Sequence, residues 1–367
     1  MKKIGLYIHV PFCRSKCPYC DFYSMRASEN DFDRYTHSVI NSMTGWAHKL
    51  NVEADTLYIG GGTPSLIGGD NISKIVSAAK ELFGADGEIT VECNPSAVED
   101  GFFEKAAQSG VNRVSLGMQS AVDSERRILG RLSGNELVQR RIEQARAAGI
   151  ENISLDVMLG VPDQTEKSLA QTVNFCIETD VPHISAYMLK LEEGTYYYNN
   201  AHKLNLPSDD SVVDMYLLLS KMLEQKGYSH YEISNFAKPG YESRHNLKYW
   251  NCDEYLGIGP SAHSFLGGKR FFYPRDLASF ESGAEPIADG DGGDYSEYVM
   301  LRLRLKDGLN YSEYEKKYSK CLPTEFTEKA RQFEKLGLMK IDGEKISLTE
   351  NGFLVSNSVI CELELCL

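Results

Sequence analysis

Six short apolar runs recur through the first half of the chain, and each has the length and composition of a β-strand. They are rich in Ile, Val, Leu and Tyr, which pleated strands favour. The runs cover residues 5–10, 55–62, 88–94, 113–119, 153–160 and 183–189. We therefore predict six strands between residues 5 and 189.

Most segments between these runs have helical periodicity. Residues 70–84 repeat apolar side chains at helical spacing behind Asp70, a suitable N-cap, and residues 134–149 end on Gly149, a common helix stop. Strands that alternate with helices form a parallel sheet. Six such units are fewer than the eight that close a complete barrel. The predicted fold class is therefore α/β, with a partial, open (β/α)6 barrel.

Polar and glycine signatures stand at the ends of five of the six runs. They are Cys13 after the first run, GGGTPS (60–65) after the second, Glu92 and Asn94 in the third, Gln119 in the fourth and Asp156 in the fifth. In parallel α/β folds, chemistry collects at the C-terminal ends of the strands. We therefore expect these residues to form one site.

The pattern changes from about residue 205 onwards. An amphipathic helix and a glycine- and aromatic-rich stretch lead into a Gly- and Asp-rich linker over residues 283–294. Helical patterns and an Asp342-Gly343 hairpin signal follow, in an order that resembles a winged helix. We expect one domain over 1–285, with 205–285 as an extension of the barrel. A smaller, helical, winged-helix-like domain is expected over 290–367.

Composition and charge narrow the classes of function. The net charge of −13 disfavours a nucleic-acid or anionic-membrane partner. The C-terminal residues 295–367 carry 12 acidic and 11 basic side chains, so DNA binding by the winged-helix-like domain is disfavoured too. No apolar run approaches the ~18 residues of a membrane span, and the N-terminus lacks the features of a signal peptide. We expect a cytoplasmic protein.

Three of the nine cysteines fall within FCRSKCPYCDF (12–22), at Cys13, Cys17 and Cys20. An odd total with a single cluster favours metal binding over a disulfide framework. One interpretation is zinc, with His9 as the fourth ligand. The other is a [4Fe–4S] cluster on three thiolates, which leaves one iron open to an exogenous ligand. The residues alone leave both interpretations open.

A family resemblance favours the cluster over zinc. C-x3-C-x2-C after the first strand, with GGGTPS after the second, resembles the signature of radical S-adenosylmethionine (SAM) enzymes. The stretches LYIHVPFC, SLGMQS, SRHNLKYW and YLGIGPSAHS resemble the heme-chaperone branch of the oxygen-independent coproporphyrinogen dehydrogenase (HemN-like) family. The resemblance covers about residues 5–270 and extends into the C-terminal domain. It implies a [4Fe–4S] cluster whose open iron chelates the amino and carboxylate groups of SAM.

The resemblance also implies the residues that hold SAM. They are Tyr7, Tyr19, Gly61, Gly62, Thr63, Glu92, Gln119, Arg131 and Asp156. Glycine lets a backbone approach a ligand closely, so its N–H groups are candidates to bond the methionine end of SAM. Glu92 and Asp156 are carboxylates within apolar runs and need partners if buried. Each role has a structural alternative. The glycines could simply form a tight turn, the two carboxylates could form internal salt bridges, and Arg131 could be an ordinary surface arginine on a helix. Relatives often have His where this chain has Ser133, two residues after Arg131.

Two departures separate the chaperone branch from the dehydrogenases. Phe22 stands where the dehydrogenases usually have a further cysteine, and the first strand begins near residue 5, without their N-terminal extension. Both departures favour the chaperone branch.

Residues 245–250 resemble the H-N-x-x-Y-W motif of the same family, and this resemblance implies heme binding. Imidazole is a usual axial ligand of heme iron, which makes His245 the first candidate. Tyr249 and Trp250 offer apolar area for a porphyrin face, and Arg244 and Lys248 offer charge for propionates. His263 is a second candidate ligand.

The expected function is to bind heme, a [4Fe–4S] cluster and SAM, and to pass heme to an acceptor protein. The acceptor is expected to be a respiratory membrane enzyme, and a dimer is possible. The alternative is an oxygen-independent coproporphyrinogen III dehydrogenase, in which a radical from SAM starts the oxidative decarboxylation of propionate side chains. A third alternative, a zinc protein that binds nucleic acid, is opposed by the charge.

Overall fold

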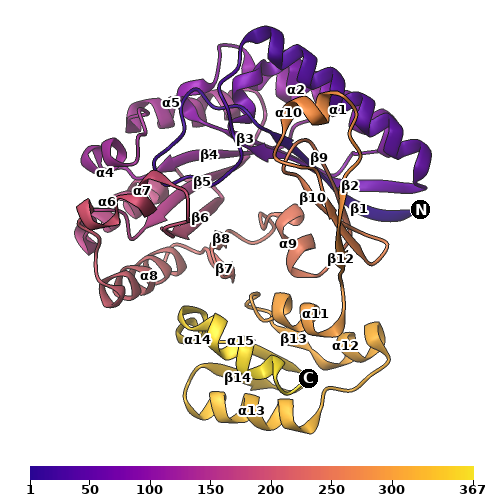
Figure 1. Ribbon diagram of the computed structural model, residues 1–367. Coiled ribbons are helices and arrows are strands. Elements are labelled where there is room, and N and C mark those ends of the chain that lie inside the picture. The colour runs from indigo at the N-terminus through magenta and orange to yellow at the C-terminus, as the bar shows by residue number, and fades with distance from the viewer.

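The computed structural model describes residues 1–367 and contains two sheets. The larger sheet has twelve strands, in the order β12-β11-β10-β9-β1-β2-β3-β4-β5-β6-β8-β7 (Figure 1). Its centre consists of the six predicted strands, which lie side by side and parallel. They are β1 (Lys2–Val10), β2 (Val52–Gly61), β3 (Glu88–Cys93), β4 (Arg113–Gln119), β5 (Asn152–Leu159) and β6 (His183–Met188). The predicted open, partial (β/α)6 barrel is confirmed.

Helices cover the outer face of the curved sheet (Figure 1). They are α1 (Glu29–Lys49), α2 (Gly68–Phe83), α3 (Phe102–Ser109), α4 (Asp123–Ile128), α5 (Asn135–Ala147), α6 (Glu166–Glu178) and α8 (Asp209–Glu224), with the short α7 (Tyr196–Asn199) after β6. The prediction that Asp70 caps α2 is wrong, because the helix begins two residues earlier and Asp70 lies in its first turn. Gly84 takes the left-handed conformation that ends this helix, at φ 61°.

The region after β6 continues the sheet at both edges. On the β6 side lie β7 (Ser229–Glu232) and β8 (Asn235–Ala237). On the β1 side lie β9 (Tyr255–Ile258), β10 (His263–Leu266), β11 (Lys269–Phe272) and β12 (Ile287–Asp291), with α9 (Arg244–Trp250) and α10 (Leu277–Glu281) between strands. The prediction that residues 283–294 form only a linker is wrong, since β12 lies within them.

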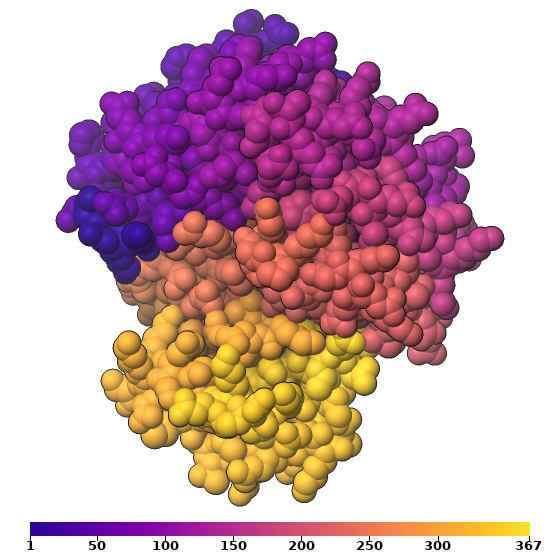
Figure 2. Space-filling model, turned by 180° about the vertical axis from the view of Figure 1, so that it is seen from behind, coloured from indigo at the N-terminus to yellow at the C-terminus, as the bar shows by residue number.

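The last segment forms a separate lobe (Figure 2). Its hydrophobic core has 16 buried residues, of which 14 belong to the lobe and two, Cys252 and Phe265, belong to the preceding region. The lobe contains α11 (Tyr295–Arg302), β13 (Leu309–Asn310), α12 (Tyr311–Tyr318), α13 (Thr324–Lys335), β14 (Met339–Asp342), β15 (Lys345–Leu348), α14 (Glu350–Leu354) and α15 (Ser356–Glu364). The predicted Asp342-Gly343 turn joins β14 to β15, and β15 lies at the centre of the three-stranded sheet. No helix in either part has the length and apolarity needed to cross a bilayer.

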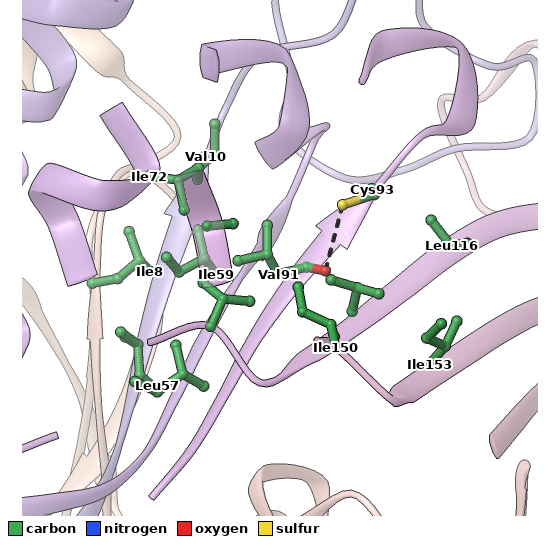
Figure 3. Packing of buried hydrophobic residues seen from close by; sticks show 14 of the residues in the cluster. Ile8, Val10, Leu57, Ile59, Ile72, Val91, Cys93, Leu116, Ile150 and Ile153 are labelled. Atoms are coloured by element: carbon green, nitrogen blue, oxygen red, sulfur yellow. Dashed lines mark hydrogen bonds between the residues drawn. The ribbon is translucent and has the colours of Figure 1, made fainter. Parts of the chain in front are cut away.

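Alternate residues along the central strands face two different environments. Ile8, Leu57, Val91 and Leu116 point outwards into the core of 56 buried residues between sheet and helices (Figure 3). The residues between them point into the barrel and are mostly polar: Thr56, Tyr58, Glu88, Thr90, Glu92, Arg113, Ser115, Ser154, Asp156, His183 and Ser185. Closed barrels fill this space with branched apolar residues. Here the outer layer supplies the hydrophobic core, and the interior is left to polar chemistry.

Candidate functional site

The loop between β1 and α1 carries the three clustered cysteines across the C-terminal end of the sheet. Its base is closed by hydrogen bonds between Cys13 and Met25 (3.0 Å) and between Met25 and Pro11 (2.8 Å). One flank accepts a hydrogen bond from α7 at the Pro18 carbonyl (3.0 Å), and the other is bonded to α10 through the Tyr23 hydroxyl (3.2 Å). The loop is therefore held on both sides (Figure 1). Cys13, Cys17 and Cys20 are free and half-buried within it.

The arrangement of the thiols fits an iron–sulfur cluster better than zinc. Nowhere do three His, Cys, Asp or Glu side chains converge as the ligands of one metal ion do. Tetrahedral zinc holds its sulfurs about 3.8 Å apart. A [4Fe–4S] cluster binds each thiolate to a different iron and spaces them more widely. His9, the candidate fourth zinc ligand, has both ring nitrogens occupied, by the Tyr7 hydroxyl (3.0 Å) and the Tyr23 carbonyl (3.1 Å).

The glycines at the end of β2 leave space that neighbouring protein side chains occupy. Gly61 has φ +111°, and a Cβ there would lie 2.8 Å from the His9 ring. A Cβ on Gly60 would lie 3.1 Å from the Glu92 carboxylate. The N–H of Gly61 donates to Glu92 Oε2 (3.1 Å), and that of Gly62 donates to the Val10 carbonyl (2.8 Å). Both N–H groups are thus engaged within the chain when SAM is absent, and contact of Gly61, Gly62 and Thr63 with SAM stays a prediction. Thr63 Oγ1 lies 3.3 Å from the Cys13 sulfur, so this turn adjoins the cysteine loop.

Glu92 and Asp156 point into the barrel from β3 and β5. Glu92 accepts hydrogen bonds from the Tyr58 hydroxyl (2.8 Å) and the Gly61 N–H, and Asp156 accepts one from Ser115 (2.8 Å). Burial raises the pKa of Glu92 to about 7 and that of Asp156 to about 6. Neither carboxylate has a salt bridge to a basic side chain. A cationic or hydroxyl-bearing ligand would supply the partner that each lacks.

Tyr19, Gln119 and Arg131 meet on the other side of this site. The Arg131 guanidinium donates two hydrogen bonds to the Tyr19 hydroxyl, at 2.9 and 3.2 Å. These bonds connect the segment that follows β4 to the cysteine loop. Gln119 ends β4 with φ +70°, at an irregularity in its pairing with β5. A Cβ on Gly117 would lie 3.2 Å from the Gln119 amide and 3.5 Å from Arg131. The absence of a side chain at Gly117 thus lets the two polar groups share one space.

The predicted heme ligand His245 lies at the opposite end of the barrel. It is fully buried, with Nδ1 2.8 Å from Thr56 Oγ1 and Nε2 2.9 Å from the Tyr249 hydroxyl. Burial lowers its pKa to about 3. Glu88 accepts hydrogen bonds from the backbone N–H groups of Arg244 (3.0 Å) and His245 (2.9 Å).

The motif at residues 245–250 therefore fastens α9 beneath the strands. Lys248, expected to meet propionates, is paired with Asp55 at 2.7 Å and is mostly buried. Ligation of heme by His245 requires one of its two hydrogen bonds to break, and it stays a prediction. The structure brings the cysteines and the SAM candidates together and leaves His245 apart from them.

The sequence analysis missed Arg113, the largest fully buried side chain. It is 2% exposed at the start of β4, its buried Nε has no hydrogen-bond partner, and its side chain forms no salt bridge. Its positive charge lowers the pKa values of the nearby Tyr58 and Glu92, although burial raises both overall. An alternating count along β4 would have placed Arg113 on the same face as Ser115 and so inside the barrel.

Replacing Glu92 by Gln is expected to stabilise the cluster-free protein at alkaline pH. The pKa of Glu92 rises from 4.5 to about 7 on folding, so ionisation costs stability progressively between these values and fully above them. The shift corresponds to about 3 kcal/mol, and loss of one hydrogen-bond acceptor reduces the expected gain to on the order of 2 kcal/mol. Urea unfolding at pH 5 and pH 8 measures the effect, which should nearly vanish at pH 5. The exposed Glu104→Gln is the control, and an equal response of both variants would contradict the assignment.

Comparison with known proteins places these features in context. The chain matches the radical SAM superfamily over residues 7–176 and the HemN C-terminal domain over residues 294–355. It is 33% identical to the heme chaperone HemW of Lactococcus lactis subsp. lactis (strain IL1403), over 98% of this chain and 96% of the relative. It is 38% identical to HemW of Escherichia coli (strain K12), over 85% of each chain.

A solved structure shows the same fold. Coproporphyrinogen III oxidase (HemN) from Escherichia coli, a radical SAM enzyme, aligns with a TM-score of 0.85 and 22% identity. The alignment covers 100% of this chain and 91% of that protein. The likeness therefore extends to the C-terminal lobe as well as the barrel.

Proposed function

Because this chain belongs to the HemW family of heme chaperones, within the radical SAM superfamily, we propose that it binds heme and delivers it to an acceptor protein. The observation that carries the proposal is identity over nearly the whole chain to HemW proteins. The polar C-terminal end of the barrel, with three free thiols, supports binding of a [4Fe–4S] cluster and SAM as cofactors.

The residues at this end divide into three groups. Cys13, Cys17 and Cys20 hold the cluster, and burial raises the pKa of the Cys20 thiol, so cluster binding displaces a proton there. When bound, a cluster with one open iron supplies a coordination site and one-electron chemistry. Glu92 and Asp156 offer carboxylate acceptors to the ammonium or ribose hydroxyls of SAM. Arg131 offers a guanidinium to its carboxylate.

A coproporphyrinogen III dehydrogenase is the second candidate function. The observation in its favour is the fold, which HemN shares over the full length of this chain. The observation against it is Phe22, which stands where these enzymes usually have a further cysteine.

The acceptor, the location and the assembly complete the proposal. We place the chain in the cytoplasm, where it would meet a respiratory membrane enzyme as heme acceptor. A dimer is the assembly we propose.

One comparison separates the two candidate functions. Protein purified without oxygen and reconstituted with iron and sulfide is titrated with heme, and separately incubated with coproporphyrinogen III, SAM and a reductant. We expect a saturable heme complex and no protoporphyrinogen IX. Robust formation of protoporphyrinogen IX would overturn the chaperone assignment in favour of the dehydrogenase.

A further inference from the structure

The location of heme follows from a comparison of the eight histidines. His9, His183, His230 and His245 are buried, and their rings are bonded to neighbouring groups. His37 is exposed but engages its Nδ1 with the Asp33 carbonyl (2.8 Å). Only His48, His202 and His263 are exposed with neither ring nitrogen engaged within the chain. Axial ligation needs one free ring nitrogen, so His37, whose Nε2 is free, joins these three as histidines available to an iron without any rearrangement.

His263 alone among these four is stacked on an aromatic ring. It begins β10 and lies opposite Phe272 of β11, with ring centroids 5.2 Å apart and planes at 24°. Phe272 in turn lies opposite Ile287 of β12, whose side chain is 50% exposed. Directly opposed residues point to the same face of a sheet. His263, Phe272 and Ile287 therefore form one continuous surface of a free imidazole beside apolar side chains, here called the His263 face.

The His263 face lies on the inner side of the curved sheet. Phe271, the neighbour of Phe272, points to the opposite side and stacks on Trp46 of the outer helix α1, with centroids 5.4 Å apart. The strand β9, which precedes β10, pairs with β1, and a Cβ on Gly259 would lie 2.6 Å from the His9 carbonyl. The turn that leads into His263 therefore adjoins the end of β1 that leads into the cysteine loop.

The cysteine loop borders the His263 face and adds apolar area and charge. Arg275, three residues after Phe272, meets Asp21 of the loop at 3.5 Å, with both side chains largely exposed. Phe22, which follows Asp21 in the cysteine loop, is 65% exposed. An exposed ion pair of this kind is weak, so the guanidinium can exchange Asp21 for a stronger partner such as a carboxylate of a ligand.

We propose that heme binds on the His263 face, with the His263 imidazole as axial ligand, Phe22, Phe272 and Ile287 against the porphyrin, and Arg275 at a propionate. The proposal rests on the heme-binding function proposed above. It assigns His245, whose ring is buried and bonded on both sides, the separate task of fixing α9 to β2. It also places heme next to the loop that carries the cluster cysteines.

Heme titration of the reconstituted full-length protein tests this assignment. We expect His263→Ala to lose the absorbance bands of imidazole-ligated heme and to weaken binding by about tenfold or more, and free imidazole to restore the bands. Arg275→Gln is expected to weaken binding severalfold with unchanged bands. His202→Ala and His48→Ala are the matched controls and should bind as wild type does.

The other outcomes separate the two proposals. Wild-type spectrum and affinity in His263→Ala would overturn the His263 face while leaving the heme-binding function intact. Loss of the bands in His245→Asn with native circular dichroism, and their retention in His263→Ala, would assign the ligand to His245. Absence of any saturable binding by the wild type would overturn both proposals.

Discussion

Cys17→Ala is expected to abolish the iron–sulfur cluster. Each of Cys13, Cys17 and Cys20 is needed to bind one iron, and with only two thiolates two irons would lack a protein sulfur. After anaerobic reconstitution, the wild type should contain roughly four irons and four sulfides per chain, and the variant close to none. Iron and sulfide analysis together with the visible absorbance of the cluster measures the loss.

Cys321→Ala provides the matched control for the cluster prediction. Cys321 is exposed in the C-terminal lobe and is unrelated to the loop at residues 12–22. It should reconstitute as the wild type does. Full iron and sulfide content in Cys17→Ala would show that the three clustered thiols do not hold the cluster.

Glu88→Ala is expected to give the largest loss of stability among single changes at the base of the barrel. The buried Glu88 carboxylate accepts the first backbone N–H groups of α9, from Arg244 and His245, and complements the positive end of this helix. Alanine leaves both donors unpaired in a buried place, at a cost of about 3 kcal/mol. Urea unfolding measures the loss, and hydrogen exchange of residues 244–250 should show early opening of α9.

Glu99→Ala is the control for this prediction. Glu99 also accepts a helix N–H, from Gly69 of α2 at 2.9 Å, but its side chain is exposed to water. Water replaces the carboxylate there, and we expect a loss of less than about 1 kcal/mol. Equal losses in the two variants would show that burial of Glu88 is not what makes its hydrogen bonds important.

The central fold was predictable from the sequence because its strands are short, apolar and regularly spaced. Cys13, Glu92, Gln119 and Asp156 were predicted to share one edge of the sheet, and the structure places them there. That inference needed only the rule that parallel strands end at the same edge. The family resemblance added the choice of cluster over zinc.

The edges of the sheet were not predictable in the same way. The strands β9 to β12 each have four or five residues and depend on pairing with β1 and with one another. In β12 all residues are exposed, and Asp289, Gly290 and Asp291 have low strand propensity. Pairing with distant strands determines the conformation of β9 to β12, and the local sequence gives no signal of that pairing.

The heme motif shows how a site prediction depends on location. The sequence places His245 four residues before Tyr249, a spacing that suits a helix face. The structure uses that spacing for a hydrogen bond between the two side chains within a buried helix. Whether a histidine is free for a ligand depends on residues far away in the chain, here Thr56, which lies 2.8 Å from Nδ1 of the His245 ring.

Electron paramagnetic resonance of the reduced, reconstituted protein, with and without SAM, tests the central claim most directly. The claim is that three cysteines leave one iron of a [4Fe–4S] cluster open, at the polar end of the barrel, for SAM to ligate. We expect the signal of a reduced [4Fe–4S] cluster whose g-values shift when SAM is added. A cluster signal that SAM leaves unchanged, or reconstituted protein that contains zinc without iron and sulfide, would contradict it.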